Sequence, residues 1–174
     1  MKNFAFVVIF FSILFNSSNI KANEKILFVD SIFILNNSLA GKSINNQLKN
    51  LNAKNAKNFK KNQSDLKLEE SKLFSQKNVL EVNQYMKKVD AFKIKVNKFN
   101  QNKKSTLDEF NKKKRDAELV LSNMLAIVLS DYAKKESVSL ILPKQSILIG
   151  KNELDITSTI KNNLDLKIKN VNIK

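Results

Sequence analysis

The chain has 174 residues and a net charge of +15, and it contains no cysteine and no histidine. The missing residue types exclude disulfide frameworks, thiol nucleophiles and Ser-His-Asp triads, and they remove the commonest ligands of zinc. Two glycines in the whole chain are too few for a glycine-rich phosphate-binding loop. We therefore predict no catalytic residues, no cofactor and no metal.

Residues 1–22 have the pattern of a secretory signal peptide. Lys2 precedes the apolar run Phe4–Phe15, which is too short to span a bilayer as a helix. Polar residues follow, and then Ile20-Lys21-Ala22, a cleavage site that ends on a small residue. We expect export and a mature chain that begins near Asn23; an uncleaved membrane anchor is the alternative.

The mature chain opens with a predicted strand. Lys25 to Asp30 is a short apolar run of strand-forming residues that ends on an acidic residue. Asp30 or Ser31 is suited to cap the turn that follows. Gly41 stands directly before a long segment of helical pattern, so we interpret it as a pivot.

Residues 42–77 are the first predicted helix of a hairpin arm. An apolar residue recurs every seven positions along it, at Phe59, Leu66, Leu73 and Leu80. One narrow ridge cannot support a helix alone, but it can lie in the groove of an antiparallel partner. We place the tip of the hairpin at Lys77–Gln84, where the apolar register shifts and two asparagines can adopt turn geometry.

The second predicted helix, Val82–Glu136, organises the chain. Neither Gly nor Pro interrupts residues 42–142. Apolar side chains recur at alternating steps of three and four, a period that predicts a coiled-coil-like seam. The seam positions are Val82, Tyr85, Val89, Phe92, Val96, Phe99, Phe110, Ala117, Val120, Met124 and Ile127. Asn100–Thr106 interrupts the seam, and we expect the arm to flex or splay there.

Two further strands are predicted after the arm. They are Val138–Leu142, which Pro143 closes, and Ser146–Ile149. Asp155 then opens a short amphipathic helix. The basic tail, Lys167–Lys174, is expected to be frayed.

The positive charge is concentrated on the arm. Residues 42–115 contain 20 basic and 7 acidic residues, a net charge of +13, whereas the rest of the mature chain is neutral. Arg115 is the only arginine, and asparagine is abundant, as in proteins encoded by A+T-rich genomes. Codon bias explains the preference for lysine but not its confinement to one region, so we interpret the arm as a functional basic surface.

The remainder of the chain is too small to stand alone. Residues 23–41 and 116–174 make a body of 78 residues, and the helix beyond Arg115 is apolar on nearly all sides. A domain of this size is marginally stable, so we predict a core shared between protomers. The predicted fold is α+β and mostly α, a long antiparallel helical hairpin (residues 42–115) on a small β-containing oligomerisation body. The residues assigned to the oligomerisation body are Ile26, Phe28, Leu125, Val128, Leu140, Leu142, Ile147 and Ile149.

The arm offers scattered apolar side chains among many lysines. Phe92 and Phe99 belong to the seam, whereas Phe74 and Met86 lie off its register and are the better candidates for exposed contact. This combination suits a weak and promiscuous binder of unfolded acidic polypeptide, and the basic arms are also able to contact a membrane surface. The predicted binding residues are Phe59, Phe74, Met86, Lys87, Lys88, Phe92, Lys93, Lys95 and Phe99.

The order of these features resembles the Skp/OmpH family of periplasmic chaperones over essentially the whole mature chain. The motifs that carry the resemblance are Val29-Asp30, the segment Asn36 to Lys42, the strand pair between Val138 and Gly150, and Asp155-Ile156-Thr157. The resemblance implies a homotrimer whose strands form a central β-body and whose three hairpins enclose a cavity for unfolded outer-membrane proteins. It also implies that Val29, Asp30, Gly41 and Asp155 to Thr157 are structural elements of that body.

The leading hypothesis is therefore an ATP-independent holdase in the periplasm, with unfolded outer-membrane proteins as partners. One alternative is a coiled-coil structural or adaptor protein of the envelope, which would need a fixed partner. Another is a basic nucleic-acid-binding protein. The signal peptide and the near absence of arginine, the usual reader of bases, argue against nucleic acid as a partner.

Overall fold

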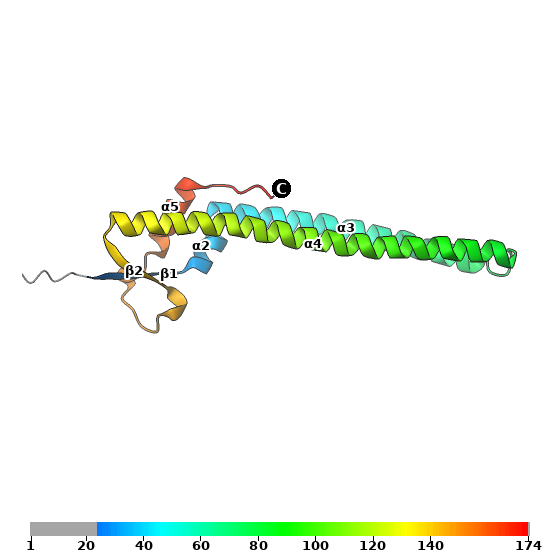
Figure 1. Ribbon diagram of the computed structural model, residues 1–174, viewed down its shortest axis with the longest axis horizontal. Helices are drawn as coiled ribbons and strands as arrows, with labels where there is room; N and C mark the ends of the chain where they lie inside the picture. Colours follow the sequence, from blue (N-terminus) through cyan, green and yellow to red (C-terminus); the bar gives the residue numbers. More distant parts are fainter. Residues whose placement is uncertain (1–23, 174) are drawn as a thin grey trace, which may run out of the picture.

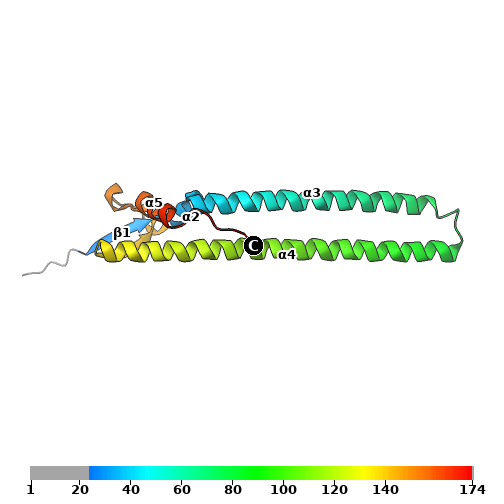
Figure 2. The same cartoon turned by 90° about the horizontal axis from the view of Figure 1, so that it is seen from above.

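The computed structural model describes residues 24–173, so the predicted signal peptide, residues 1–22, lies outside the described residues. A long antiparallel hairpin projects from a small body (Figures 1 and 2). Helix α3 spans Leu39–Ser75 and helix α4 spans Val82–Lys135. At a rise of about 1.5 Å per residue, α3 is about 55 Å long and α4 about 80 Å long.

The hairpin has the predicted form, with small differences at its ends. Helix α4 begins at the predicted Val82 and runs through Asn100–Thr106 without a break, so local splaying there stays a prediction. The turn between the helices comprises residues 76–81, inside and just before the predicted tip. Helix α3 starts three residues earlier than predicted because Ser38 caps it, with the Ser38 Oγ accepting a hydrogen bond from the Gly41 amide at 3.1 Å.

Gly41 is therefore not the predicted pivot. It lies within the first turn of α3 and is buried. The short helix α2, Ser31–Asn37, packs so closely that a Cβ on Gly41 would lie 1.8 Å from the Leu35 carbonyl oxygen. Glycine is needed here for the close approach of two backbone segments rather than for bending.

Two parallel strands form the sheet of the body. Strand β1 is Lys25–Val29 and strand β2 is Val138–Pro143, both close to their predicted limits. The two strands pair in register from Ile26 opposite Leu140 to Val29 opposite Pro143. An irregularity next to Lys25 precedes this stretch. The hairpin arm thus serves as the long crossover connection that a parallel pair requires.

The predicted third strand, Ser146–Ile149, is wrong. Lys144–Ser146 form a 3-10 turn (η1), and a second 3-10 turn (η2) follows at Asn152–Leu154. The free edge of β1 is instead approached by Asp155, which bridges to Phe28, while the Ile156 amide donates to the Phe28 carbonyl at 3.0 Å. That edge of β1 is therefore not available to residues 146–149, which form no strand.

Acidic side chains hold the starts of both short helices: Asp30 is the predicted N-cap of α2, whereas Asp155 stands one residue before Ile156, the N-cap of α5. The Asp30 carboxylate accepts from the Phe33 amide at 2.8 Å at the start of α2. The Asp155 carboxylate accepts from the Thr157 amide at 2.9 Å, where helix α5, Thr157–Lys167, begins. The Thr157 hydroxyl in turn accepts from the Asp30 amide at 2.8 Å, so one hydrogen bond joins the two helix starts.

The core lies where the hairpin meets the body. Along α4 the buried residues are spaced by four, four and three positions, which matches the 3.6-residue period of a straight helix rather than the predicted 3.5. As a consequence, the predicted seam residues Val120 and Ile127 are 48% and 49% exposed. The buried apolar side chains include Leu27, Val29, Ile34, Ile44, Leu48, Ala117, Leu121, Leu125, Val128, Ile156, Ile160 and Leu164.

The C-terminal tail is not frayed, contrary to the expectation from its polar sequence. Val171 is buried against the core. The Gln47 side chain of α3 donates to the Val171 carbonyl at 2.8 Å and accepts from the Ile173 amide at 3.1 Å. These hydrogen bonds between the Gln47 side chain and the backbone of the tail hold the tail along the base of the arm (Figure 2).

The observed architecture is the predicted class, a mostly helical chain with a long hairpin on a small strand-containing body. The apolar core stops at Leu48 on α3 and at Ala117 on α4. Within the described residues, none between these two positions is fully buried. The arm is therefore nearly all surface.

Candidate functional site

The arm is held together by a half-buried seam. Phe59 on α3 meets Phe99 on α4 edge to face, with ring centroids 6.5 Å apart and an interplanar angle of 84°. Leu66, Phe92 and Val96 are also half-buried along the same line. An aromatic pair in this geometry contributes about 0.5–1.5 kcal/mol beyond its burial. Phe59, Phe92 and Phe99 thus have the structural role in the hairpin that was predicted for Phe92 and Phe99.

Phe74 and Met86, which were predicted to lie off the seam, are both exposed. Phe74 is 74% exposed and Met86 is 48% exposed, on opposite sides of the hairpin turn. Exposed apolar groups of this size raise the free energy of the arm in water unless a partner covers them. The structure thus leaves both residues available for contact.

Further exposed apolar side chains lie near these two and were not identified from the sequence. These side chains are Leu68, Val79, Val82 and Ile94. Val82 was predicted as the first seam position but is 77% exposed beside the turn, whereas the other three lie off the predicted seam.

The lysines predicted to bind clients are exposed, but they differ in their contacts with neighbouring side chains. The Lys88 Nζ donates to the Gln76 side chain at 2.7 Å, across the turn. Lys93 pairs with Asp90 at 3.2 Å on the same helix, and Lys95 pairs with Glu69 on α3. Exposed ion pairs contribute little to stability, about 0–1 kcal/mol, but each carboxylate offsets the positive charge of its lysine.

Open grooves flank the seam in the middle of the arm. The larger has a volume of about 600 Å³, with Leu66, Phe92, Val96 and Phe99 at its floor and Lys67 and Lys93 among its lining residues. The ring edges of the seam are therefore reachable from solvent even though the rings are half-buried. A groove with an apolar floor and lysines beside it can receive an apolar side chain next to a carboxylate.

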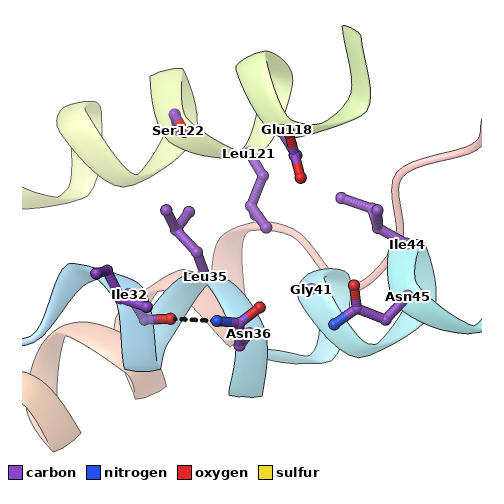
Figure 3. A pocket seen from close by; sticks show the side chains of 9 residues that line it. All are labelled: Ile32, Leu35, Asn36, Gly41, Ile44, Asn45, Glu118, Leu121 and Ser122. Carbon is purple, nitrogen blue, oxygen red and sulfur yellow. Dashed lines mark hydrogen bonds between the residues drawn. The ribbon is translucent and has the colours of Figure 1, made fainter. Parts of the chain in front are cut away.

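A second cavity lies at the root of the arm, where α2, α3 and α4 meet (Figure 3). It has a volume of about 300 Å³. Asn36 turns its amide to the Ile32 carbonyl at 3.0 Å and so stays within α2. The lining residues are Ile32, Leu35, Asn36, Gly41, Ile44, Asn45, Glu118, Leu121 and Ser122. Its polar side chains do not converge on a common point in the way a catalytic or metal site requires.

The residues assigned to the oligomerisation body fall into three groups. Phe28, Leu125 and Val128 are buried inside the chain, and Leu142 and Ile147 are half-buried. The third group, Ile26, Leu140 and Ile149, is exposed, with Ile149 at 96%. Leu148 beside Ile149 is also fully exposed and was not assigned from the sequence.

The Asp155 carboxylate of the body is held by two partners. Its Oδ2 lies 2.7 Å from the Lys144 Nζ, and its Oδ1 accepts from the Thr157 amide. Partial burial opposes ionisation of this carboxyl, but the hydrogen bonds from Lys144 and Thr157 outweigh it and lower its pKa. The same hydrogen bond raises the pKa of Lys144. These partners give Asp155 a structural role at the start of α5 rather than that of a general acid or base.

Neither a membrane span nor a metal site is present within residues 24–173. None of the helices in this range combines the length and apolar character that a membrane span requires. No group of three acidic residues in the same range is placed to hold a metal ion.

Comparisons with known proteins give a consistent result. A family model for outer membrane protein (OmpH-like) matches residues 25–164. A crystal structure of a candidate outer membrane chaperone (OmpH-like) from Caulobacter crescentus shares the fold, with a TM-score of 0.81 at 17% identity, over 87% of this chain and 89% of that chain. No curated protein matches the sequence. The resemblance drawn from the sequence motifs is thereby confirmed.

Proposed function

The chain belongs to the OmpH-like outer membrane protein family, and from this premise we propose that it is an ATP-independent holdase chaperone. In this role it binds unfolded outer-membrane proteins in the periplasm and prevents their aggregation. It acts by non-covalent contact alone, without a cofactor and without catalysis.

The single observation that carries the proposal is the surface of the arm. Large apolar side chains such as Phe74 and Met86 stand exposed on a hairpin whose net charge is +13. A surface that is both apolar and cationic fits a polypeptide that has not yet buried its own apolar residues. We therefore assign client binding to the arm. The proposed binding residues are Phe59, Phe74, Met86, Lys87, Lys88, Phe92, Lys93, Lys95 and Phe99.

The two kinds of contact have different strengths and ranges. Charge on an exposed surface acts within about 8 Å at physiological salt, so it speeds encounter but holds a client weakly. A well-buried apolar side chain contributes about 1.5–3 kcal/mol. Several such contacts, formed and exchanged independently, hold a chain without fixing its conformation. Release then follows when the client folds or passes to another acceptor.

We propose in addition that the body assembles into a homo-oligomer. Ile26 and Leu140 on the strands and Leu148 and Ile149 in the following loop are exposed in the single chain. An apolar surface of this kind is covered in most soluble proteins, and a second copy of the same chain is the economical partner. The trimeric state is taken from the family resemblance.

The localisation rests on the N-terminal sequence. Residues 1–22 have the composition of a signal peptide, which would deliver the mature chain to the periplasm. N-terminal sequencing of the protein from an envelope fraction is expected to begin near Asn23. A chain that still begins at Met1 would contradict export by cleavage.

The decisive experiment measures aggregation of an unfolded β-barrel protein by light scattering after dilution from urea. The wild-type protein is expected to suppress aggregation without nucleotide, and native mass spectrometry should detect an oligomer with bound client. The variant with Phe74→Ser and Met86→Ser should release clients faster with the oligomer intact. The matched control carries Asn78→Ser and Asn83→Ser, two exposed polar positions at the same tip, and should behave as wild type. Equal suppression by all three proteins at low and high salt would refute the arm as the binding surface.

A further inference from the structure

Charge is distributed unevenly along the length of the arm. The contacts Phe59–Phe99 and Glu69–Lys95 show which levels of α3 and α4 lie side by side. They divide the arm into a proximal half, residues 49–64 with 98–115, and a distal half, residues 65–97. The proximal half contains 12 basic and 2 acidic residues, a net charge of +10, whereas the distal half contains 7 basic and 5 acidic residues, a net charge of +2.

Most cations of the proximal half also lack a carboxylate partner. Among the described residues, only Lys113 and Lys114 of the twelve lie within ion-pair distance of a carboxylate. Lys57 and Lys61 face the same side of α3 one turn apart, an arrangement that destabilises a helix unless an anion lies between them. The distal lysines, by contrast, include Lys93 and Lys95, whose charges are offset by Asp90 and Glu69.

Exposed apolar side chains have the opposite distribution. Six large apolar side chains of the distal half are exposed, whereas the proximal half has only Leu107 among the described residues. The six are Leu68, Phe74, Val79, Val82, Met86 and Ile94. The two properties that the proposed function requires therefore occupy different lengths of the same hairpin.

We infer that the arm is a bipartite binding surface, in which the distal half takes apolar client segments and the proximal half takes acidic ones. The inference rests on the proposed chaperone function and names the chemistry of each part. It transfers the main acidic contact from Lys87, Lys88, Lys93 and Lys95 to the proximal cations. Acidic polypeptide is the occupant that the arrangement favours, because one extended client can then touch both halves.

The dimensions fit such a client. Lys57 and Phe74 are 17 residues apart on α3, which corresponds to about 25 Å along the helix axis. An extended polypeptide covers that distance with about eight residues. An unfolded chain whose acidic and apolar segments have that separation can therefore engage both halves of one arm at once.

The test uses the purified protein and two fluorescent six-residue peptides, one of Asp and Glu and one neutral with Phe and Leu. The proximal variant replaces Lys54, Lys57, Lys61 and Lys104 by Gln, and the matched distal variant replaces Lys87, Lys88, Lys93 and Lys95 by Gln. Fluorescence anisotropy at low salt should show a loss of affinity for the acidic peptide on the order of tenfold in the proximal variant. In the distal variant the loss should be about twofold or less, because two of its lysines are already paired.

The neutral peptide should bind both lysine variants as it binds wild type, and it should not compete with the acidic peptide. An equal loss of affinity for the acidic peptide in both variants would overturn the bipartite arrangement and leave the chaperone proposal in place. Competition between the two peptides would have the same consequence. Binding of phosphatidylglycerol vesicles but not of the acidic peptide to the proximal half would also overturn it. If wild type binds neither peptide and does not suppress aggregation of an unfolded β-barrel protein, the proposed function itself fails.

Discussion

Replacing Gly41 by alanine should destabilise the base of the arm, although alanine is the better helix former. The added methyl group would lie 1.8 Å from the Leu35 carbonyl oxygen and 2.9 Å from its carbon, both backbone atoms of α2. Helices α2 and α3 would have to separate by at least 1.2 Å to reach the 3.0 Å that Cβ contacts require. The Ser38 cap lies 3.1 Å from the same methyl position and would be displaced with them.

The magnitude follows from opposing terms. Alanine in place of glycine inside a helix gains about 1 kcal/mol. Overpacking a site that cannot relax costs about 3 kcal/mol, and loss of a serine cap costs about 1 kcal/mol more. The expected result for Gly41→Ala is therefore a net loss of about 3 kcal/mol in the free energy of unfolding.

Urea unfolding followed by circular dichroism measures this loss, at one fixed protein concentration because the protein is proposed to be oligomeric. The control is Asn46→Ala, at an exposed position of α3 five residues after Gly41. This substitution should raise the free energy of unfolding by about 0.5 kcal/mol. If Gly41→Ala gains stability in parallel with the control, helix propensity alone governs position 41 and the close packing of α2 is refuted.

Three further predictions concern the body. Leu125→Asp should cost several kcal/mol because it places a charge without a partner in the core, and wild-type stability by circular dichroism and urea unfolding would contradict this role of Leu125. Asp155→Asn should destabilise the protein at pH 7 but much less at pH 3: the folded-state pKa of Asp155 is lowered, so its contribution is present above the unfolded pKa of about 3.9 and is lost as the pH falls through the folded value. Urea midpoints at the two pH values measure the difference, and an equal difference at both would show that Asp155 ionisation does not contribute. Truncation after Ile168 removes the burial of Val171 and its bonds to Gln47, a loss of about 2–3 kcal/mol; hydrogen exchange of residues 43–48 should accelerate, and unchanged exchange would show that the tail does not hold the arm.

The exposed apolar surface of the arm could be predicted in part from the sequence. A side chain that is off the apolar register, as Phe74 and Met86 are, has no partner on the facing helix, so its exposure follows from one-dimensional spacing. The separation of charge from apolar surface required the pairing of α3 with α4. That pairing assigns Lys57 and Lys104 to one half and Met86 to the other, although Lys104 and Met86 belong to the same helix.

The sequence by itself determined the features that depend on local interactions. An uninterrupted apolar period without Gly or Pro specifies α4, and an acidic residue before a helix, as at Asp30 and Asp155, specifies a helix start at which its carboxylate accepts a backbone amide. Tertiary structure decided the features that depend on distant residues. Asp155 approaches the free edge of β1, whereas the predicted strand Ser146–Ile149 does not form, and Gln47 binds a tail that has no periodic pattern of its own. The need for glycine at position 41 depends on the path of α2. Which face of α4 is buried depends on the elements that pack against it. Gly41 and Leu35 are only six positions apart, but their close approach depends on the path of the chain between them. The other deciding contacts join segments that are distant in the sequence, so no short window contains both partners.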